Sequence, residues 1–176
     1  TDTDVTDGVL YHYVVTAVDA SMNESAMPGE VSAQPGATES VIVQENTRGF
    51  CGVDVGTIDN NNAGYTGYGF ANTENAVGEG VEWNVTIPAG GSYTVSWRYA
   101  NGSSDRPGVL RVDGSTAASI SFPGTGDWTA WSQVSQTVSL PAGTHTLRLQ
   151  ATGSGGLGNI DYIKIAGDTV TPNSCP

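Results

Sequence analysis

Polar and apolar residues alternate along most of the chain after residue 40, with the period of two that is typical of β-strands. In "SYTVSWRYAN", residues 92–101, the alternation places Tyr93, Val95, Trp97 and Tyr99 on one face. Similar segments recur at the intervals typical of an antiparallel sandwich. The predicted strands are 40–46, 80–88, 92–101, 108–114, 119–124, 131–141, 144–153 and 159–167.

The turn residues between these segments agree with this prediction. "PAGGS" at 88–92 and "PAGTH" at 141–145 each end one strand and begin another, and "DG" at 113–114 marks a tight hairpin. The chain has 24 Gly and 8 Pro, and few stretches favour a helix. We therefore predict an all-β fold, an antiparallel β-sandwich of the jelly-roll type.

A boundary is expected at "SAQPGATES", residues 32–40, which divides the chain into 1–36 and 37–176. The earlier part has an alternating strand, a polar turn and a short second strand. Its run of Tyr11, Tyr13, Val15, Ala17 and Asp19 resembles the last two strands of a fibronectin type III domain, about a third of such a domain. Because two strands are marginal alone, this part is either a truncated neighbour or a short N-terminal β-hairpin leaning on the sandwich.

The charge of the chain excludes some partners. Six Lys and Arg stand against 18 Asp and Glu, a formal net charge of -12, so nucleic acid or an anionic membrane surface would be repelled. No apolar run approaches the roughly 20 residues that span a bilayer, and no segment resembles a signal peptide. We expect a soluble, mature or excised piece of a protein with no nucleic-acid or membrane partner.

The two cysteines, Cys51 and Cys175, lie far apart and have no CxxC spacing, which argues against a zinc or thioredoxin-like site. A disulfide between them is the favoured interpretation, and two unrelated free thiols are the alternative. A bond would join the last residues to the early part of the domain. A disulfide would also imply export, because the cytosol keeps thiols reduced.

Catalytic motifs are scarce. The only histidines are His12 and His145, and His145 lies in a strand-initiating turn where a solvated residue is expected. The sequence has no GxSxG, HExxH or phosphate-binding GxxxxGK motif. A glycosidase needs only two carboxylates, but none of the acids here lies in a context that marks it as catalytic. We therefore predict a protein that is not an enzyme.

Aromatic residues beside amides and Gly-rich loops suit sugar recognition, because an aromatic face stacks on a pyranose while amides and Arg hydrogen-bond its hydroxyls. Four segments of this kind follow one another along the chain: "NNNAGYTGYGFANTEN", "WRYANGSSDRPGVLRVDGS", "FPGTGDWTAWSQVSQTVSLPAGTHTLRL" and "GLGNIDYIKIAG". In order and spacing, across residues 41–166, they resemble family 35 carbohydrate-binding modules, relatives of family 6. The variant with "GFCGVD" and "TIDNNN" most resembles modules attached to bacterial pectate lyases.

The resemblance implies a binding pocket in the loops at one end of the sandwich. Trp128 is the implied stacking platform, and Tyr65 would line the pocket. Hydroxyl or carboxylate contacts would come from Arg98, Asn101 and Asn159. Alternatives are that Tyr65 only packs a loop and that Arg98 is a structural ion-pair partner. Trp131 is expected in the core.

The resemblance also implies calcium. Glu45 and Asp161 match the positions of a structural site, and their oxygens suit a hard cation, although Val43 stands where the family often has a second acid. A second calcium, at the pocket, would draw on Asp59 and the neighbouring amides. These candidates are Asp59, Asn60, Asn61 and Asn62, whose alternative role is an Asn-rich turn.

The function implied is that of a non-catalytic module that targets a parent polysaccharide-degrading enzyme to plant or algal polysaccharide. The expected ligand is a chain-end uronic acid, glucuronic or unsaturated galacturonic acid, held with calcium. The expected protein is a secreted, extracellular bacterial one, with this module a monomer tethered to a catalytic domain. Two alternatives stay open: binding of neutral galactan, mannan or agar fragments, and an adhesion or spacer module with no sugar ligand.

Overall fold

The computed structural model describes residues 4–5, 9–33 and 39–176. Contacts divide the chain into two compact units, Thr1–Thr38 and Glu39–Pro176. The division falls two residues from the boundary expected from the sequence.

The described part of the first unit contains an antiparallel pair, β1 (Tyr11–Tyr13) and β2 (Val31–Ala33), in the register Tyr11 to Ala33. The segment between them turns at Asp19, whose Oδ1 accepts hydrogen bonds from the amides of Ser21 and Asn23. Many large apolar side chains here are exposed, as expected for two strands without a second sheet. They are Val9, Leu10, Val14, Val15, Val18, Met22, Met27 and Val31.

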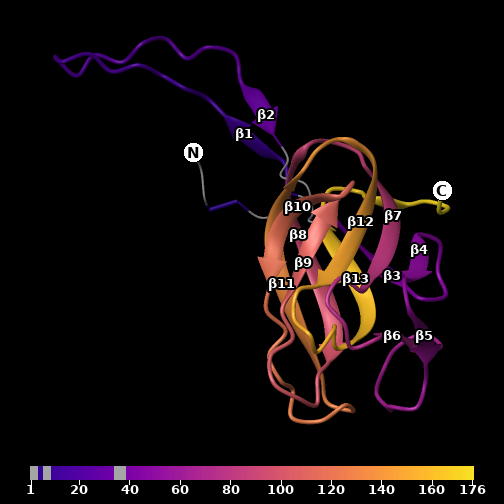
Figure 1. Ribbon diagram of the computed structural model, residues 1–176. Helices are drawn as coiled ribbons and strands as arrows, with labels where there is room; N and C mark the ends of the chain where they lie inside the picture. The colour runs from indigo at the N-terminus through magenta and orange to yellow at the C-terminus, as the bar shows by residue number, and fades with distance from the viewer. Residues whose placement is uncertain (1–3, 6–8, 34–38) are drawn as a thin grey trace. The chain divides into compact units, whose positions relative to one another are not determined.

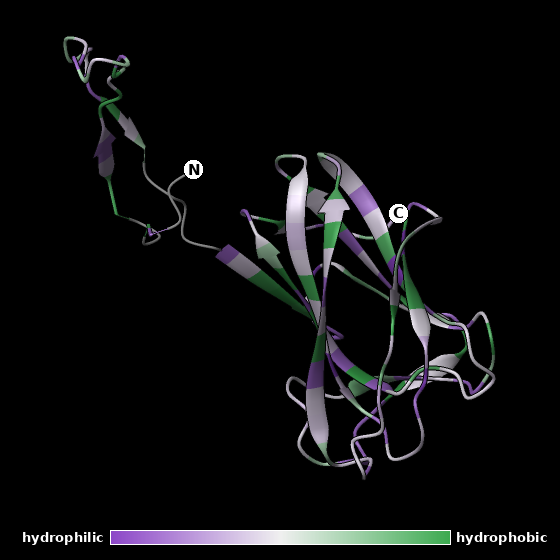
Figure 2. Cartoon of the chain, turned by 90° about the vertical axis from the view of Figure 1, so that its left-hand side faces the viewer, coloured by the Kyte–Doolittle hydropathy of each residue, from purple (hydrophilic) through white to green (hydrophobic). Residues whose placement is uncertain are grey.

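The second unit is a sandwich of two antiparallel sheets, which confirms the predicted fold class (Figures 1 and 2). The first sheet has the order β10-β9-β12-β7-β14, with β4 also pairing β7; the second has the order β11-β8-β13-β6-β5, with β3 also pairing β13. The strands are β3 (Glu39–Gln44), β4 (Phe50–Val53), β5 (Gly56–Asp59), β6 (Phe70–Thr73), β7 (Gly80–Ile87), β8 (Gly91–Ala100), β9 (Gly108–Val112), β10 (Ser115–Ile120), β11 (Trp131–Leu140), β12 (Gly143–Ala151), β13 (Asn159–Gly167) and β14 (Thr171–Pro172). In the described residues there is no helix with the length and apolar character needed to cross a membrane.

The core lies between the sheets and uses the alternation expected from the sequence. Tyr93, Val95, Trp97 and Tyr99 of β8 are all buried, and Trp97 contacts Phe122 edge-on. The strand predicted at 119–124 instead spans Ser115–Ile120. The reason is the two-residue turn at Asp113 and Gly114, whose φ angles of 48° and 82° return the chain directly into β10.

A disulfide joins Cys51 in β4 to Cys175 near the C-terminus, which confirms the predicted pairing. The two residues are 124 positions apart in sequence and their Cα atoms are 5.5 Å apart. Closing so long a loop stabilises the folded state by about 5 kcal/mol in the chain-entropy description. The bond ties the end of the chain to the edge of the first sheet.

The sandwich has two distinct ends. Short turns join β7 to β8 and β11 to β12 at one end, and the longer β8–β9, β10–β11 and β12–β13 loops gather at the other (Figure 1). The chain also enters β13 at this second end, beside the start of β6, where Ile160 pairs with Ala71. The long loops therefore bring distant parts of the sequence together.

Candidate functional site

A cavity of about 230 Å³ lies at the loop end of the sandwich, and we call it the end cavity. Its lining comes from five separate segments of the chain. Of the six described residues that line it, one is charged, one is aromatic and four are amides. They are Asn62, Asn72, Asn75, Arg106, Trp128 and Asn159.

Trp128 forms an aromatic wall of the end cavity and belongs to the β10–β11 loop. The loop is held by Asp127, whose Oδ1 accepts hydrogen bonds from the amide and hydroxyl of Thr129 and lowers its own pKa by doing so. The indole lies against Gly102, where a Cβ atom would come within 2.6 Å of it. A side chain at position 102 would therefore displace the ring.

Arg106 supplies the positive charge of the end cavity. Its guanidinium lies over the Trp128 ring, with Cζ 4.9 Å from the centroid. Nη1 donates to Asn75 Oδ1 at 2.7 Å, to the Leu157 carbonyl at 2.8 Å and to the Gly155 carbonyl. Burial lowers the pKa of Arg106. The guanidinium nevertheless stays charged, because the pKa of an arginine is far above neutral pH. The charge is fixed in position rather than carried on a free side chain.

Asn159, the first residue of β13, is only 3% exposed and lines the end cavity. Its Nδ2 is buried and forms no hydrogen bond with any residue that the structure describes. A buried donor without a partner costs about 1–3 kcal/mol. An acceptor atom of a bound molecule would remove this cost.

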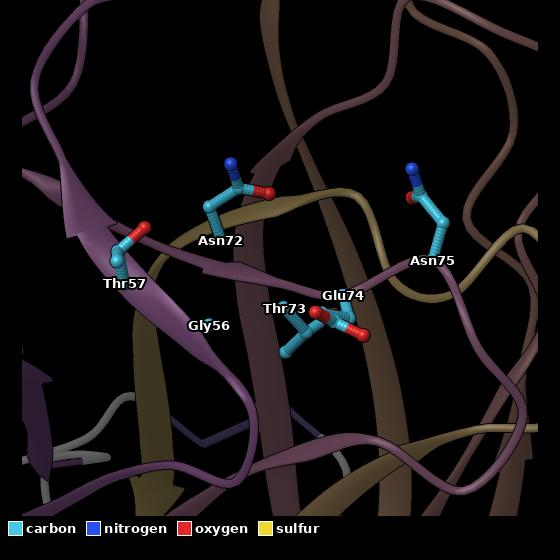
Figure 3. Close-up of a pocket in the computed structure, with 6 residues that line it drawn as sticks. All are labelled: Gly56, Thr57, Asn72, Thr73, Glu74 and Asn75. Atoms are coloured by element: carbon cyan, nitrogen blue, oxygen red, sulfur yellow. The ribbon is translucent and has the colours of Figure 1, made fainter.

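Asn72 is oriented by a hydrogen bond to Asp59. Thr57 in β5 pairs with Asn72 in β6, and Asp59 accepts hydrogen bonds from Thr57 Oγ1 at 2.6 Å and from Asn72 Nδ2 at 2.8 Å. These two hydrogen bonds hold the pKa of Asp59 below its usual value, and the bond from Thr57 has the larger effect. The carbonyl oxygen of Asn72 points toward the side of Asn75 (Figure 3).

Asn101 was expected to contact the ligand, but its side chain is 0% exposed. Its Nδ2 donates to the Ser104 and Phe122 carbonyls, and its Oδ1 accepts from the amide and hydroxyl of Ser103. Both ends of the amide are therefore used, within the β8–β9 loop and across to the start of the β10–β11 loop. Asn101 shapes the loop that carries Arg106 and does not line the end cavity.

Arg98 lies in a second group of side chains, outside the lining of the end cavity. Its Nη1 forms an ion pair with Asp161, and its Nη2 donates to the Gly64 carbonyl at 2.9 Å. The side chain of Asp161 is 0% exposed, whereas that of Arg98 is 23% exposed. Burial raises the pKa of Asp161, while hydrogen bonds from Thr66 and Arg98 act in the opposite direction. This geometry fits the structural ion-pair alternative for Arg98.

The aromatic residues beside Arg98 pack against the β5–β6 loop, residues 60–69, which also contains Gly64. The Tyr65 ring lies 5.9 Å from Phe70, which contacts Trp131 at 5.4 Å. Trp131 Nε1 donates to the Ala63 carbonyl at 2.9 Å, and its ring lies 5.1 Å beneath Arg98 Cζ. Trp131 was expected in the core, but it is only half-buried because it begins β11 at the loop end. Tyr65 and Trp131 hold the loop in place.

Glu45, directly after β3, contacts the same β5–β6 loop as Asp161 of β13. Its Oε1 accepts hydrogen bonds from the amides of Tyr68 and Gly69, and Thr66 binds Asp161 through its amide and hydroxyl. The other oxygen, Glu45 Oε2, is buried and has no hydrogen-bond partner in the described part of the chain. Among the described residues, no three His, Cys, Asp or Glu side chains come together as metal ligands.

The sequence interpretation did not single out Asn72, Asn75 or Arg106. All three lie inside segments that resemble the family, yet no local pattern separates them from their neighbours. Asn60 and Asn61 are exposed, and of this Asn run only Asn62 lines the end cavity. The signal that could have selected Arg106 is its place in a loop at the same end as Trp128.

Comparison with known proteins identifies the family. Residues 36–167 match the family described as carbohydrate binding module (family 6). The chain is 43% identical over 138 residues to endo-1,4-beta-xylanase B and to alpha-L-arabinofuranosidase C, both from Cellvibrio japonicus. These matches cover 77% of this chain but only 23% and 22% of the two relatives. The chain therefore spans less than a quarter of either enzyme.

Solved structures agree. A family 35 module of Cellvibrio japonicus Abf62 is 42% identical with a TM-score of 0.76, covering 78% of this chain and 100% of that one. A second, Xyl-CBM35 in complex with a glucuronic acid containing disaccharide, is 42% identical with a TM-score of 0.73, covering 77% and 99%. Such modules are non-catalytic parts of larger glycoside hydrolases. The chain belongs to the family 6 carbohydrate-binding modules and their family 35 relatives, and it is a binding module rather than an enzyme.

Proposed function

We propose that the end cavity binds a single terminal sugar of a polysaccharide, and that this sugar is a uronic acid. The observation that carries the proposal is the buried Nδ2 of Asn159, a hydrogen-bond donor with no partner in the described residues, beside an aromatic wall and a fixed cation. Trp128 offers a face for the apolar side of a pyranose, and the amides suit its hydroxyls. The cavity of about 230 Å³ suits one sugar ring better than a long segment.

The acidic character of the sugar follows from Arg106. The protein carries a net charge of -12, so its overall field repels an anion, and any attraction must be local. A guanidinium held in a partly buried site binds a carboxylate more strongly than one in water, because charge-assisted hydrogen bonds gain from lower local dielectric. The relative Xyl-CBM35, solved with a glucuronic acid containing disaccharide, supports this choice.

Titration calorimetry with glucuronic acid and with glucose tests this proposal. We expect glucuronic acid to bind more tightly, and Asn159→Ala to weaken that binding about tenfold, the equivalent of one lost hydrogen bond. Asn60→Ala is the matched control and should bind as the unmodified protein does, because Asn60 is exposed outside the lining. Equal affinity for both sugars would favour the neutral-sugar alternative. No binding of either would favour a spacer module.

We also propose that calcium binds between Glu45 and Asp161. The support is the buried, unpartnered Oε2 of Glu45, because an orphaned carboxylate oxygen suits a hard cation. Bound calcium would supply positive charge that ties β3 to β13 and the β5–β6 loop. The second predicted calcium, at Asp59, Asn60 and Asn61, does not fit as well. Asp59 is engaged by Thr57 and Asn72, and no carboxylate is among the residues lining the end cavity.

The setting of the module is proposed on the same grounds. We propose that it is secreted by a bacterium and tethered to a catalytic domain that degrades plant or algal polysaccharide. The disulfide between Cys51 and Cys175 suits an oxidising compartment, and similar modules occur in a xylanase and an arabinofuranosidase. A pectate lyase parent and a fibronectin type III origin for residues 1–36 remain predictions.

A further inference from the structure

A second hollow, of about 720 Å³, adjoins the end cavity on the side of strands β5 and β6 (Figure 3). We call it the edge hollow. It shares Asn72 and Asn75 with the end cavity, so the two spaces meet across these side chains. Its described lining is Gly56, Thr57, Asn72, Thr73, Glu74 and Asn75.

The polar groups of the edge hollow are held by the fold before any ligand is present. Thr57 and Asn72 both bind Asp59, and Asn75 Oδ1 accepts from Arg106, which leaves the Nδ2 of Asn75 as a donor. Thr73 is 5% exposed, and its Oγ1 is buried without a hydrogen-bond partner in the part of the chain described. An unpartnered buried hydroxyl is a group that a ligand atom can satisfy.

The charge of the edge hollow is opposite to that of the end cavity. Glu74 is the charged residue of its described lining, and no Lys or Arg is among these residues. The carboxylate of Asp59 lies directly behind Thr57 and Asn72. A ligand carboxylate in the edge hollow would be repelled by Glu74 and Asp59. Glu74 is exposed, so solvent and salt screen this repulsion, but only in part. A neutral sugar would meet hydroxyl and amide groups without that penalty.

We propose that the edge hollow is a subsite for a neutral sugar residue next to the terminal uronic acid. This inference rests on the proposed function of the end cavity. It narrows the ligand to a neutral polysaccharide that carries an acidic sugar at its end or branch, and it disfavours a polyuronate such as pectin. No aromatic residue is among the described lining, so hydrogen bonds alone would hold this second residue, and the gain in affinity is modest.

The test compares three probes by titration calorimetry: glucuronic acid, a glucuronosyl-xylose disaccharide and digalacturonic acid. We expect the glucuronosyl-xylose to bind about three- to tenfold more tightly than glucuronic acid, as one or two added hydrogen bonds would give. Digalacturonic acid should gain nothing over the monosaccharide. Glu74→Gln should strengthen binding of digalacturonic acid about threefold, because it removes the nearby charge, and leave glucuronic acid unchanged.

Asp168→Asn is the matched control, because it removes the same charge beyond the far end of β13. It should leave the affinities for all three probes unchanged. If glucuronic acid binds but the neutral second residue adds nothing, or if Glu74→Gln does not alter digalacturonic acid binding, the edge hollow is not a subsite. If glucuronic acid itself fails to bind, the function proposed for the end cavity fails as well.

Discussion

Replacing Trp128 by alanine should abolish most sugar binding and leave the fold intact. The indole lies in a loop, so its removal costs the domain only its packing on Gly102 and its contact with Arg106, the latter about 0.5–1 kcal/mol. Truncating a central aromatic anchor typically costs a binding site about 2 kcal/mol or more, which corresponds to about thirtyfold in Kd. Affinity should therefore fall far more than stability does.

Trp131→Ala is the matched comparison, because Trp131 lies three positions away and makes structural contacts. It would lose a hydrogen bond to Ala63, an edge contact with Phe70 and the cation–π contact with Arg98. Together these amount to about 3 kcal/mol of unfolding free energy. Calorimetric titration and thermal melting of both variants give the four values needed. Trp128 is not the stacking platform if Trp128→Ala keeps its affinity within about twofold, or if both variants melt and bind alike.

Three further outcomes are expected. Reducing the Cys51–Cys175 bond should lower the unfolding free energy by about 5 kcal/mol, measured by denaturant melts with and without reductant; an unchanged midpoint would contradict this. Asp161→Ala should cost about 2–4 kcal/mol in the same assay and blunt any calcium dependence, because Arg98 loses its buried partner; unaltered melting and calcium response would contradict it. The pKa of Asp59 is lower in the folded state than the unfolded value of 3.8. The contribution of Asp59 to the free energy of unfolding is therefore complete above pH 3.8 and is lost as the pH falls through the folded-state pKa. NMR titration of the Asp59 carboxyl group in the native protein should give a pKa below 3.8, and a pKa at or above 3.8 would contradict this prediction.

The long strands could be predicted from the sequence because their alternation reflects burial on one face. Strands β7, β8, β12 and β13 each have eight or more residues, and their apolar positions form the core. The short strands β4, β5 and β6 were not predicted. Each has only four residues and includes a Gly, Thr or Asn, so the segment is too short to show a clear alternation, and pairing with a neighbouring strand decides its conformation.

The site was predictable in part, for a physical reason that Arg98 and Arg106 illustrate. Both belong to the same segment, but Arg98 lies within β8 and meets Asp161, which is 63 positions away. Arg106 lies in the following loop, where contacts with Asn75 and Leu157 hold it in the end cavity. Such pairings between distant positions have no local signature. Trp128 and Asn159, which line the end cavity, were singled out from the sequence because their motifs resemble the family.

The end cavity, rather than the group of side chains around Arg98 and Asp161, should receive the sugar. The chain has four tryptophans, whose indole N–H signals resolve in an NMR spectrum and report on different places. Trp83 and Trp97 are buried in the core, and the Trp131 indole N–H donates a hydrogen bond to the Ala63 carbonyl. On titration with glucuronic acid, the Trp128 indole and the Asn159 side-chain amide should shift most. Larger shifts at Trp131 and Arg98, or none at Trp128 despite measured binding, would contradict the account.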